Sequence, residues 1–196
     1  MPMNLRSLVC LALTAGTIGT HAQSFEPGDN VAGLMLGLGG HYGHYDHYSS
    51  VSPGVGLFYE KATGVDVGPG VLGLGGFLGY KHLSYDANWT YGPTRYHYDY
   101  SWTYTILGFR GAYHYNDWHQ VPKLDTYGGL MLGFNVVSFK DKSDYPTGYY
   151  YTGDSDSYMS LTLFLGARYY FSENFGALAE LGYGVSYFSL GVAYKF

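Results

Sequence analysis

The carboxyl-terminal stretch from Asp156 to Phe196 alternates with a period of two between apolar residues and small or polar residues. In its first segment one parity is apolar or aromatic throughout: Met159, Leu161, Leu163, Leu165, Ala167, Tyr169 and Phe171. Successive side chains of a β-strand point to opposite faces, so an alternation of this kind predicts strands. Two further alternating segments follow the turn SENF and the tight connection GYGV. The stretch therefore predicts three antiparallel strands with one apolar face and one small, polar face.

The same alternation recurs in five earlier segments, which brings the number of predicted strands to eight. These segments are residues 30–42, 53–61, 71–82, 101–115 and 123–139. The connections after the first, third and fifth segments are long and polar, and those after the second, fourth and sixth are shorter. An up-and-down barrel places alternate connections on opposite rims, and a transmembrane strand needs roughly 9 to 11 tilted residues. The pattern predicts an all-β, eight-stranded antiparallel up-and-down barrel.

The composition favours a barrel in lipid over a soluble one. Charged residues make up 13% of the chain, whereas soluble domains typically have roughly 25%. Aromatic residues reach 19%, and there are 30 glycines. Transmembrane barrels combine a smooth apolar band, aromatic girdles and small lumen residues. The formal net charge of −5 disfavours nucleic acid as a partner.

Residues 1–22 have the features of a cleaved signal peptide. Arg6 supplies a positive charge, an apolar run follows, and Thr20-His21-Ala22 forms a small-x-small cleavage site. Cys10, the single cysteine, follows Val9 rather than a small residue, which argues against a lipidated cysteine. We expect an exported chain that begins at Gln23, with residues 23–196 forming the barrel domain and no disulfide.

The leader, the alternating segments and the closing GARYYFSENFGALAELGYG and SLGVAYKF resemble the small outer-membrane β-barrel proteins of Gram-negative bacteria. That group includes OmpA- and OmpX-type barrels and opacity-like porin-family proteins, and the resemblance covers the whole mature chain. It implies a monomer in the cell outer membrane, in contact with its lipid and lipopolysaccharide, with no active site and no cofactor. In that family a terminal phenylalanine after alternating hydrophobic residues is read by the barrel-assembly machinery. This implies an assembly-signal role for Leu190, Val192, Tyr194 and Phe196.

Periodicity alone does not tell whether the apolar face points inward or outward. A secreted, lipocalin-like barrel would bury that face and hold a ligand inside. The low charge, the terminal Phe196 and the lack of cysteine in the exported part favour the membrane barrel, with its apolar face outward.

If the apolar face points outward, a set of charged residues on the other parity lines a narrow lumen. These are Glu60, Lys81, Arg110, Asp125, Arg168, Glu180 and Lys195. Arg168 and Glu180 lie symmetrically about the turn at Asn174, and Arg110 and Asp125 flank the preceding turn in the same way, so each couple is expected to pair. Buried charges need partners. The network could serve an ion pathway or gate, but an eight-stranded interior is only wide enough for side chains, which favours a plug.

The segment HYGHYDHY carries His41, His44 and His47, with Asp46 among them. Imidazole and carboxylate groups bind zinc, nickel or copper. A spacing of three suits ligands on a helix, however, and in an extended segment or loop these side chains splay apart. Such residues are also ordinary polar material for the rim of a barrel, so the three histidines are weak metal candidates.

These observations predict a non-enzymatic outer-membrane scaffold whose Tyr-, His- and Asp-rich outer loops serve recognition or adhesion. A small passive channel is the first alternative. A lipid-modifying enzyme at the rim is the second, although no spacing of Ser, His and acidic residues marks a catalytic set.

Overall fold

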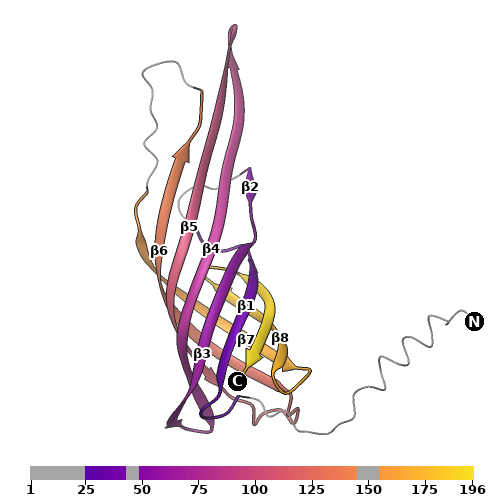
Figure 1. Ribbon diagram of the computed structural model, residues 1–196. Helices are drawn as coiled ribbons and strands as arrows, with labels where there is room; N and C mark the ends of the chain where they lie inside the picture. Colours follow the sequence, from indigo (N-terminus) through magenta and orange to yellow (C-terminus); the bar gives the residue numbers. More distant parts are fainter. Residues whose placement is uncertain (1–24, 43–48, 145–154) are drawn as a thin grey trace, which may run out of the picture.

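The computed structural model describes residues 25–42, 49–144 and 155–196, which form nine strands. Eight of them close into a barrel in which every neighbouring pair is antiparallel, and the β4–β5 pairing completes the ring (Figure 1). The strands are β1 Asn30–Leu38, β2 Ser50–Val51, β3 Gly54–Val67, β4 Gly70–Tyr91, β5 Thr94–His114, β6 Leu124–Asp141, β7 Tyr158–Tyr170, β8 Phe175–Tyr183 and β9 Phe188–Lys195. The predicted eight-stranded antiparallel barrel is confirmed, and β2 is an additional short strand paired to β4.

The apolar parity of the strands faces outward. In β1, Leu34, Leu36 and Leu38 are about half exposed, at 49%, 54% and 52%, whereas Val31 and Met35 on the other parity are buried. The same alternation runs along β6 and β7. The lipocalin-like alternative is therefore wrong, because the apolar side chains cover the outside of the barrel. No helix among the described residues is long and apolar enough to cross a membrane.

The two rims of the barrel differ in their connections. One rim, here called the base, carries the turns at 68–69, 115–123 and 171–174 together with the chain end at Phe196 (Figure 1). Gly68 has a φ of +65°, which a glycine adopts without strain in the tight β3–β4 turn. The barrel closes at the base through two backbone hydrogen bonds between Asn30 and Phe196. The opposite rim, here called the mouth, carries the remaining connections.

The segment 83–99, expected to be a loop, is instead strand in almost its whole length. β4 and β5 pair without interruption from Val71 opposite His114 to Tyr91 opposite Thr94, so only Gly92 and Pro93 form the turn. Tyr, Trp and Thr are strong strand formers, and they recur along both arms of this segment. The polar composition suggested a loop, but the β-propensity of the tyrosines and threonines decides the local structure.

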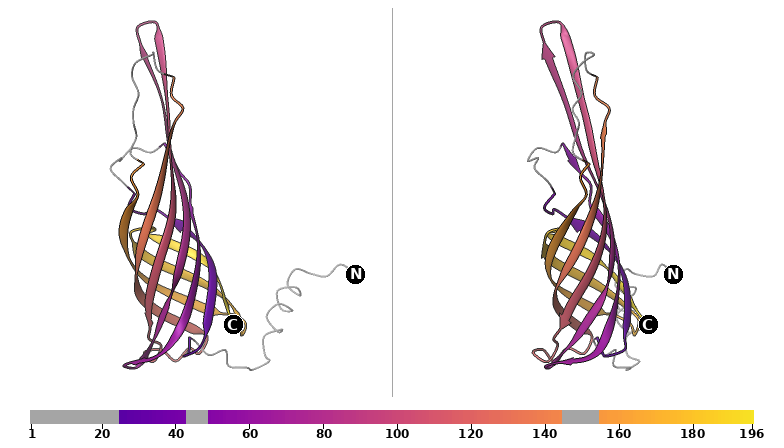
Figure 2. Two further views of the ribbon diagram at one scale, coloured as in Figure 1. Left: turned by 60° about the vertical axis from the view of Figure 1, so that its left-hand side comes forward. Right: turned by 90° about the vertical axis from the view of Figure 1, so that its left-hand side faces the viewer.

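The β4–β5 hairpin and the end of β6 rise well above the mouth (Figure 2). Towards the mouth, β3 and β4 are paired as far as Val55 opposite Tyr80. β6 stays paired to β5 further, as far as Asp141 opposite Tyr100. At about 3.3 Å per residue, the part of β4 beyond Tyr80 spans about 35 Å. We call residues 81–91, 94–104 and 136–141 together the tall wall.

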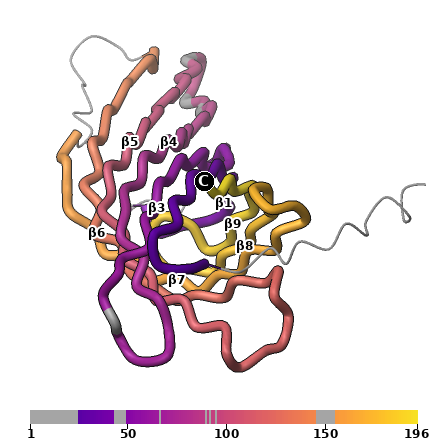
Figure 3. The backbone as a smooth tube through the Cα atoms, turned by 60° about the horizontal axis from the view of Figure 1, so that its bottom comes forward, coloured from indigo at the N-terminus to yellow at the C-terminus, as the bar shows by residue number. Residues whose placement is uncertain are grey.

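The core lies inside the barrel and is built in layers along its axis. Seen from the base, the strands surround the lumen (Figure 3). A layer near the base contains Phe25, Val31, Met35, Phe58, Ala62, Leu178 and Ala193. A middle layer contains Ala112, Tyr127, Met131 and Phe164. A layer near the mouth contains Tyr42, Leu83, Trp102, Tyr104, Ile106 and Val137. Aromatic and charged side chains therefore share the lumen.

Candidate functional site in the lumen

The charged residues expected to line the lumen lie on its wall, and six of the seven are buried. These six are Glu60, Lys81, Arg110, Asp125, Arg168 and Glu180, each at most 7% exposed. Lys195 is only partly buried and lies with its Nζ atom 3.5 Å from Asp29 Oδ2. Each of these strand positions has the parity that points away from the apolar exterior, which is why the closed barrel encloses them.

Four ionisable residues form the most enclosed group, here called the base cluster: Glu60, His114, Asp125 and Arg168. Arg168 donates a hydrogen bond to Glu60, and its Nη1 atom lies 3.6 Å from Asp125 Oδ2. His114 places Nε2 2.7 Å from Glu60 Oε1 and Nδ1 2.8 Å from Asp125 Oδ1. The four side chains come from β3, β5, β6 and β7, so the cluster ties strands on opposite sides of the lumen together.

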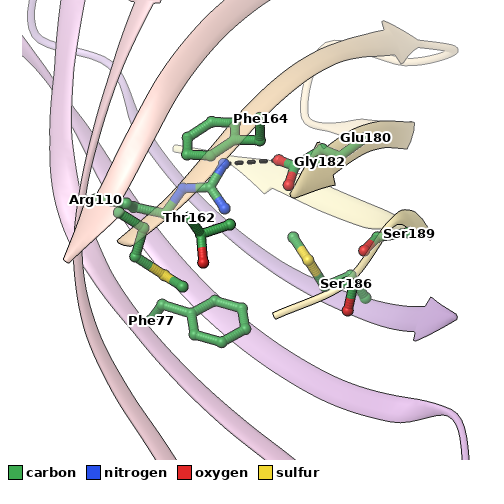
Figure 4. Close-up of a pocket in the computed structure, with 10 residues that line it drawn as sticks. Phe77, Arg110, Thr162, Phe164, Glu180, Gly182, Ser186 and Ser189 are labelled. Atoms are coloured by element: carbon green, nitrogen blue, oxygen red, sulfur yellow. Dashed lines mark hydrogen bonds and ion pairs between the residues drawn. The ribbon is translucent and has the colours of Figure 1, made fainter. Parts of the chain in front are cut away.

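A second ion pair lies above the base cluster. Arg110 Nη2 donates to Glu180 Oε1 at 2.6 Å, and the Tyr127 hydroxyl donates to the same oxygen at 2.8 Å. The guanidinium also lies 4.2 Å from the ring centroid of Phe164 (Figure 4). Beside this pair is a cavity of about 30 Å³ that Thr162 and Ser189 help to line, large enough to hold water.

The predicted pairing of Arg168 with Glu180 is wrong. In the β7–β8 register Arg168 stands opposite Leu178, and Glu180 stands opposite Gly166, because the turn centres one position earlier than expected. Glu180 instead pairs with Arg110 from β5. Long side chains reach across a narrow lumen, so their partners come from other strands and not from the adjacent hairpin arm.

The predicted pairing of Arg110 with Asp125 is also wrong. In the β5–β6 register Arg110 stands opposite Met131, and Asp125 lies beyond the paired part of β5. Asp125 stands opposite Arg168 in the β6–β7 register, accepts a hydrogen bond from Asn116 and lies within hydrogen-bond distance of His114 Nδ1. The long connection 115–123 shifts the two strands away from a register in which Arg110 and Asp125 would stand opposite each other.

Sequence reasoning missed three residues of this site. His114 shares the parity of Arg110 in β5, and Tyr127 shares the parity of Asp125 in β6, so alternation alone could have found both. Phe25 is 2% exposed and lies with its ring centroid 4.1 Å from that of His114. It precedes the first strand, and no periodic signal marks it.

At the mouth, Tyr42 folds inward over the lumen. Its ring packs edge-on against Tyr104, with the centroids 4.9 Å apart, and its hydroxyl donates to the Val185 carbonyl. Lys81 lies beneath it, with Nζ 4.4 Å from the ring centroid, and donates to the Gly39 carbonyl. Burial raises the pKa of Tyr42 above its ordinary value, so the hydroxyl keeps its proton and remains a donor. Tyr42 and Lys81 together fill the upper lumen.

Two of the three candidate metal histidines, His44 and His47, lie outside the described residues. His41 is exposed, and its ring stacks on Tyr183 with the centroids 5.9 Å apart. Across residues 25–42, 49–144 and 155–196, no group of three His, Cys, Asp or Glu side chains is placed to hold a metal ion.

The four residues of the expected assembly signal all face outward. Leu190, Val192, Tyr194 and Phe196 are 52%, 54%, 41% and 59% exposed. Tyr194 and Phe196 also stack, with their ring centroids 5.9 Å apart. They form a continuous apolar strip along β9 and the residue that follows it. Their role as an assembly signal stays a prediction.

A closed eight-stranded barrel with an apolar exterior and a charged, filled interior is a transmembrane β-barrel. No protein-family model matches the chain, and a search of curated proteins also found no match.

Solved structures of small transmembrane barrels do match. Ail, the attachment invasion locus protein of Yersinia pestis, is 16% identical over 87% of this chain and 100% of Ail, with a TM-score of 0.46. The N-terminal β-barrel domain of Pseudomonas aeruginosa OprF is 16% identical over 87% of this chain and 98% of that domain, with a TM-score of 0.45. A de novo designed transmembrane β-barrel is 17% identical over 89% of this chain and 100% of the design, with a TM-score of 0.44. At these identities the likeness concerns the fold alone.

Proposed function

We propose that this chain is a monomeric outer-membrane barrel that presents the tall wall outside the cell to bind a partner molecule. The observation that carries the proposal is the β4–β5 hairpin, which continues far beyond the end of the barrel (Figure 2). A barrel that served only to span the membrane would not need this extension, since the remaining strands end near the mouth.

The exterior supports the placement in a membrane. Outward-facing aromatic residues lie near the mouth, at Tyr80 and Tyr183, and near the base, at Phe175 and Tyr194. Leucine and valine side chains cover the surface between them. Transmembrane barrels carry aromatic girdles at both interfaces, with short turns in the periplasm and longer loops outside. This rule directs the base toward the periplasm and the tall wall toward the outside.

The tall wall has one aromatic face and one polar face. On the face that continues the lumen side, the Tyr100 ring contacts those of Tyr85, Tyr98, Trp102 and Phe139, with centroids 5.9 to 6.3 Å apart. The other face bears His82, Ser84, Asp86 and Asn88 of β4. Tyr and Trp supply large, rigid contact area and are enriched among the residues that dominate binding energy. Such a surface suits recognition.

The filled lumen supports a scaffold over a passive channel. The base cluster and Arg110–Glu180 occupy its lower half, and Tyr42 with Lys81 occupies its upper half. We expect no stepwise conductance from the protein in planar bilayers. Steady ion-selective steps would replace the scaffold proposal with the channel.

The proposal is tested by shortening the tall wall without disturbing the barrel. Removing residues 84–91 and 94–101 leaves Gly92-Pro93 joining Leu83 to Trp102, which already face each other, and takes away Tyr85, Tyr98 and Tyr100 of the aromatic face. An even number of residues leaves each arm, so no side chain changes face. The full and shortened proteins, in lipid nanodiscs, would be compared on the same array of glycans and proteins. We expect the shortened barrel to resist detergent until boiled and to lose the binding of the full chain. Equal binding would overturn the recognition role.

We also propose that the barrel-assembly machinery recognises the outward strip that ends at Phe196. Deleting Phe196 is expected to lower the amount of assembled barrel much more than replacing Tyr98 of the tall wall. A Phe196→Ser variant separates the two roles of this residue, because it keeps the backbone bonds to Asn30. Normal assembly of Phe196→Ser would argue against the signal.

A further inference from the structure

The hydrogen bonds of His114 require more protons than a neutral imidazole can supply. Both ring nitrogens lie within hydrogen-bond distance of carboxylate oxygens, Nε2 at 2.7 Å from Glu60 and Nδ1 at 2.8 Å from Asp125. An ionised carboxylate only accepts, and a neutral imidazole has a single N–H. One further proton must therefore be held within this group of three side chains.

We propose that His114 is a proton-binding site whose imidazole carries both ring protons, and that Phe25 closes this site from the base. The imidazolium donates one N–H to Glu60 and the other to Asp125. The only covalent bond formed is the N–H bond to the added proton, which comes from solvent during folding.

The other donors around the cluster favour the proton on the imidazole rather than on a carboxyl group. Glu60 also accepts from Arg168, and Asp125 Oδ1 also accepts from Asn116 at 3.3 Å. Hydrogen bonds from such donors stabilise the ionised form of a carboxylate. Each carboxylate therefore already accepts a hydrogen bond from a second donor. A protonated carboxylic acid would accept a weaker hydrogen bond from that donor.

The charge balance of the base cluster supports the same assignment. Four groups face His114: Glu60 from β3, Asp125 and the Tyr127 ring from β6, and Arg168 from β7. With an imidazolium, two carboxylates face two cations and the cluster is neutral. With a neutral imidazole, one negative charge would stay buried without a partner, which is costly. The nearest further pair, Arg110 with Glu180, is balanced by itself.

Phe25 covers one side of the His114 ring near the base. The His114 side chain is fully buried, and its ring lies between those of Phe25 and Tyr127, with centroids 4.1 and 5.0 Å away. Aromatic faces attract cations, so both rings favour the charged imidazole. Phe25 stands three positions after the expected cleavage site at Ala22, so the start of the mature chain supplies the lid.

The first test is nuclear magnetic resonance of the protein labelled with ¹⁵N-histidine, in nanodiscs, between about pH 6 and pH 8. We expect one histidine to show two protonated ring nitrogens throughout this range. A His114→Gln variant assigns the signal by its loss. If that variant does not fold, a Phe25→Leu variant assigns it by the displacement of the same signal.

Two results would overturn the proton site: a ring nitrogen of His114 without a proton at pH 7, or the loss of a His114 ring proton between about pH 6 and pH 8. The lid is tested separately by hydrogen exchange of the His114 ring protons. Phe25→Ala should accelerate this exchange by about tenfold or more, because a local barrier to opening is removed. Unchanged exchange in an assembled Phe25→Ala barrel would overturn the lid. None of these readouts depends on the tall wall, so they are independent of the proposed recognition role.

Discussion

The base of the lumen and the tall wall are built from the same strands and the same side-chain parity, yet they carry opposite chemistry. On β5 the inward positions near the base are Arg110 and His114, and above the mouth they are Tyr96, Tyr98 and Tyr100. Inside the closed barrel a side chain is surrounded on every side, and the charges near the base are held in ion pairs. Above the mouth the same face is open on one side, and half-buried aromatic rings cover one another.

This difference assigns separate tasks to the two regions. Pairing at the base joins strands far apart in the sequence, such as β3 and β7 through Glu60 and Arg168. Contacts in the tall wall join strands that their backbone already pairs. The base should therefore control stability, and the tall wall should control binding. The predictions below test this division in order of decreasing effect on stability.

The largest effect is expected at Glu60. Glu60→Gln leaves Arg168 and His114 without their shared carboxylate, a loss of roughly 3 to 5 kcal/mol for breaking a buried pair. Urea unfolding in lipid vesicles measures the loss. Adding Arg168→Met should recover part of the lost stability, because the guanidinium that lost its carboxylate partner is then removed.

The matched control for this pair is the partly exposed Lys195–Asp29 pair at the base. Its double-mutant cycle should give a coupling below about 1 kcal/mol, as solvent-screened pairs do. The Glu60–Arg168 cycle should exceed that value. Additive effects at Glu60 and Arg168 would contradict the base cluster as a coupled unit.

A smaller effect is expected from Tyr127→Phe. The change removes only the hydroxyl that donates to Glu180, and a hydrogen bond to a charged group contributes about 1.5 to 3 kcal/mol. Arg110 still neutralises Glu180, so no charge is stranded. Unfolding in urea is again the measurement. A loss as large as that of Glu60→Gln would mean that this bond, not the ion pairing, dominates the lower lumen.

Tyr42→Phe is expected to cost less again. It removes the hydroxyl that donates to the Val185 carbonyl at the mouth, and a neutral hydrogen bond contributes about 0.5 to 1.5 kcal/mol. The ring and its contacts with Lys81 and Tyr104 remain. If the lumen then conducted ions in a planar bilayer, Tyr42 would be a gate and not merely part of the plug.

The smallest effect on stability is expected in the tall wall. Asn88→Ser on the polar face should change the free energy of unfolding by less than about 0.5 kcal/mol, as surface substitutions usually do. Shortening the wall to Leu83 and Trp102 should likewise keep the barrel resistant to detergent. A barrel that unfolded readily after this change would show that the wall contributes to stability, which would remove the contrast with the base.

The sequence by itself determined which residues form strands and which face each side chain takes. Alternation is a local property of an extended chain, so it places Leu34 on one face and Met35 on the other without any long-range contact. The low charge of the chain then favoured Leu34 outside and Arg110 in the lumen. The same alternation also marks His114 and Tyr127. It could have been followed through Tyr96, Tyr98 and Tyr100, where polar composition suggested a loop and the tyrosines in fact continue the strand.

Only the tertiary structure decided which charged residues meet. Partners across a lumen depend on the register of every strand and on the closure of the ring, and an error of one position at a turn moves a pair by two residues. Arg168 reaches Glu60, 108 positions away in the chain, and not Glu180 in the adjacent strand. Phe25 lies outside the alternating segments, and Tyr42 ends the first of them, beyond the last residue of β1. They enter the lumen because a closed barrel offers two ends to be filled, and no periodicity in the chain records that.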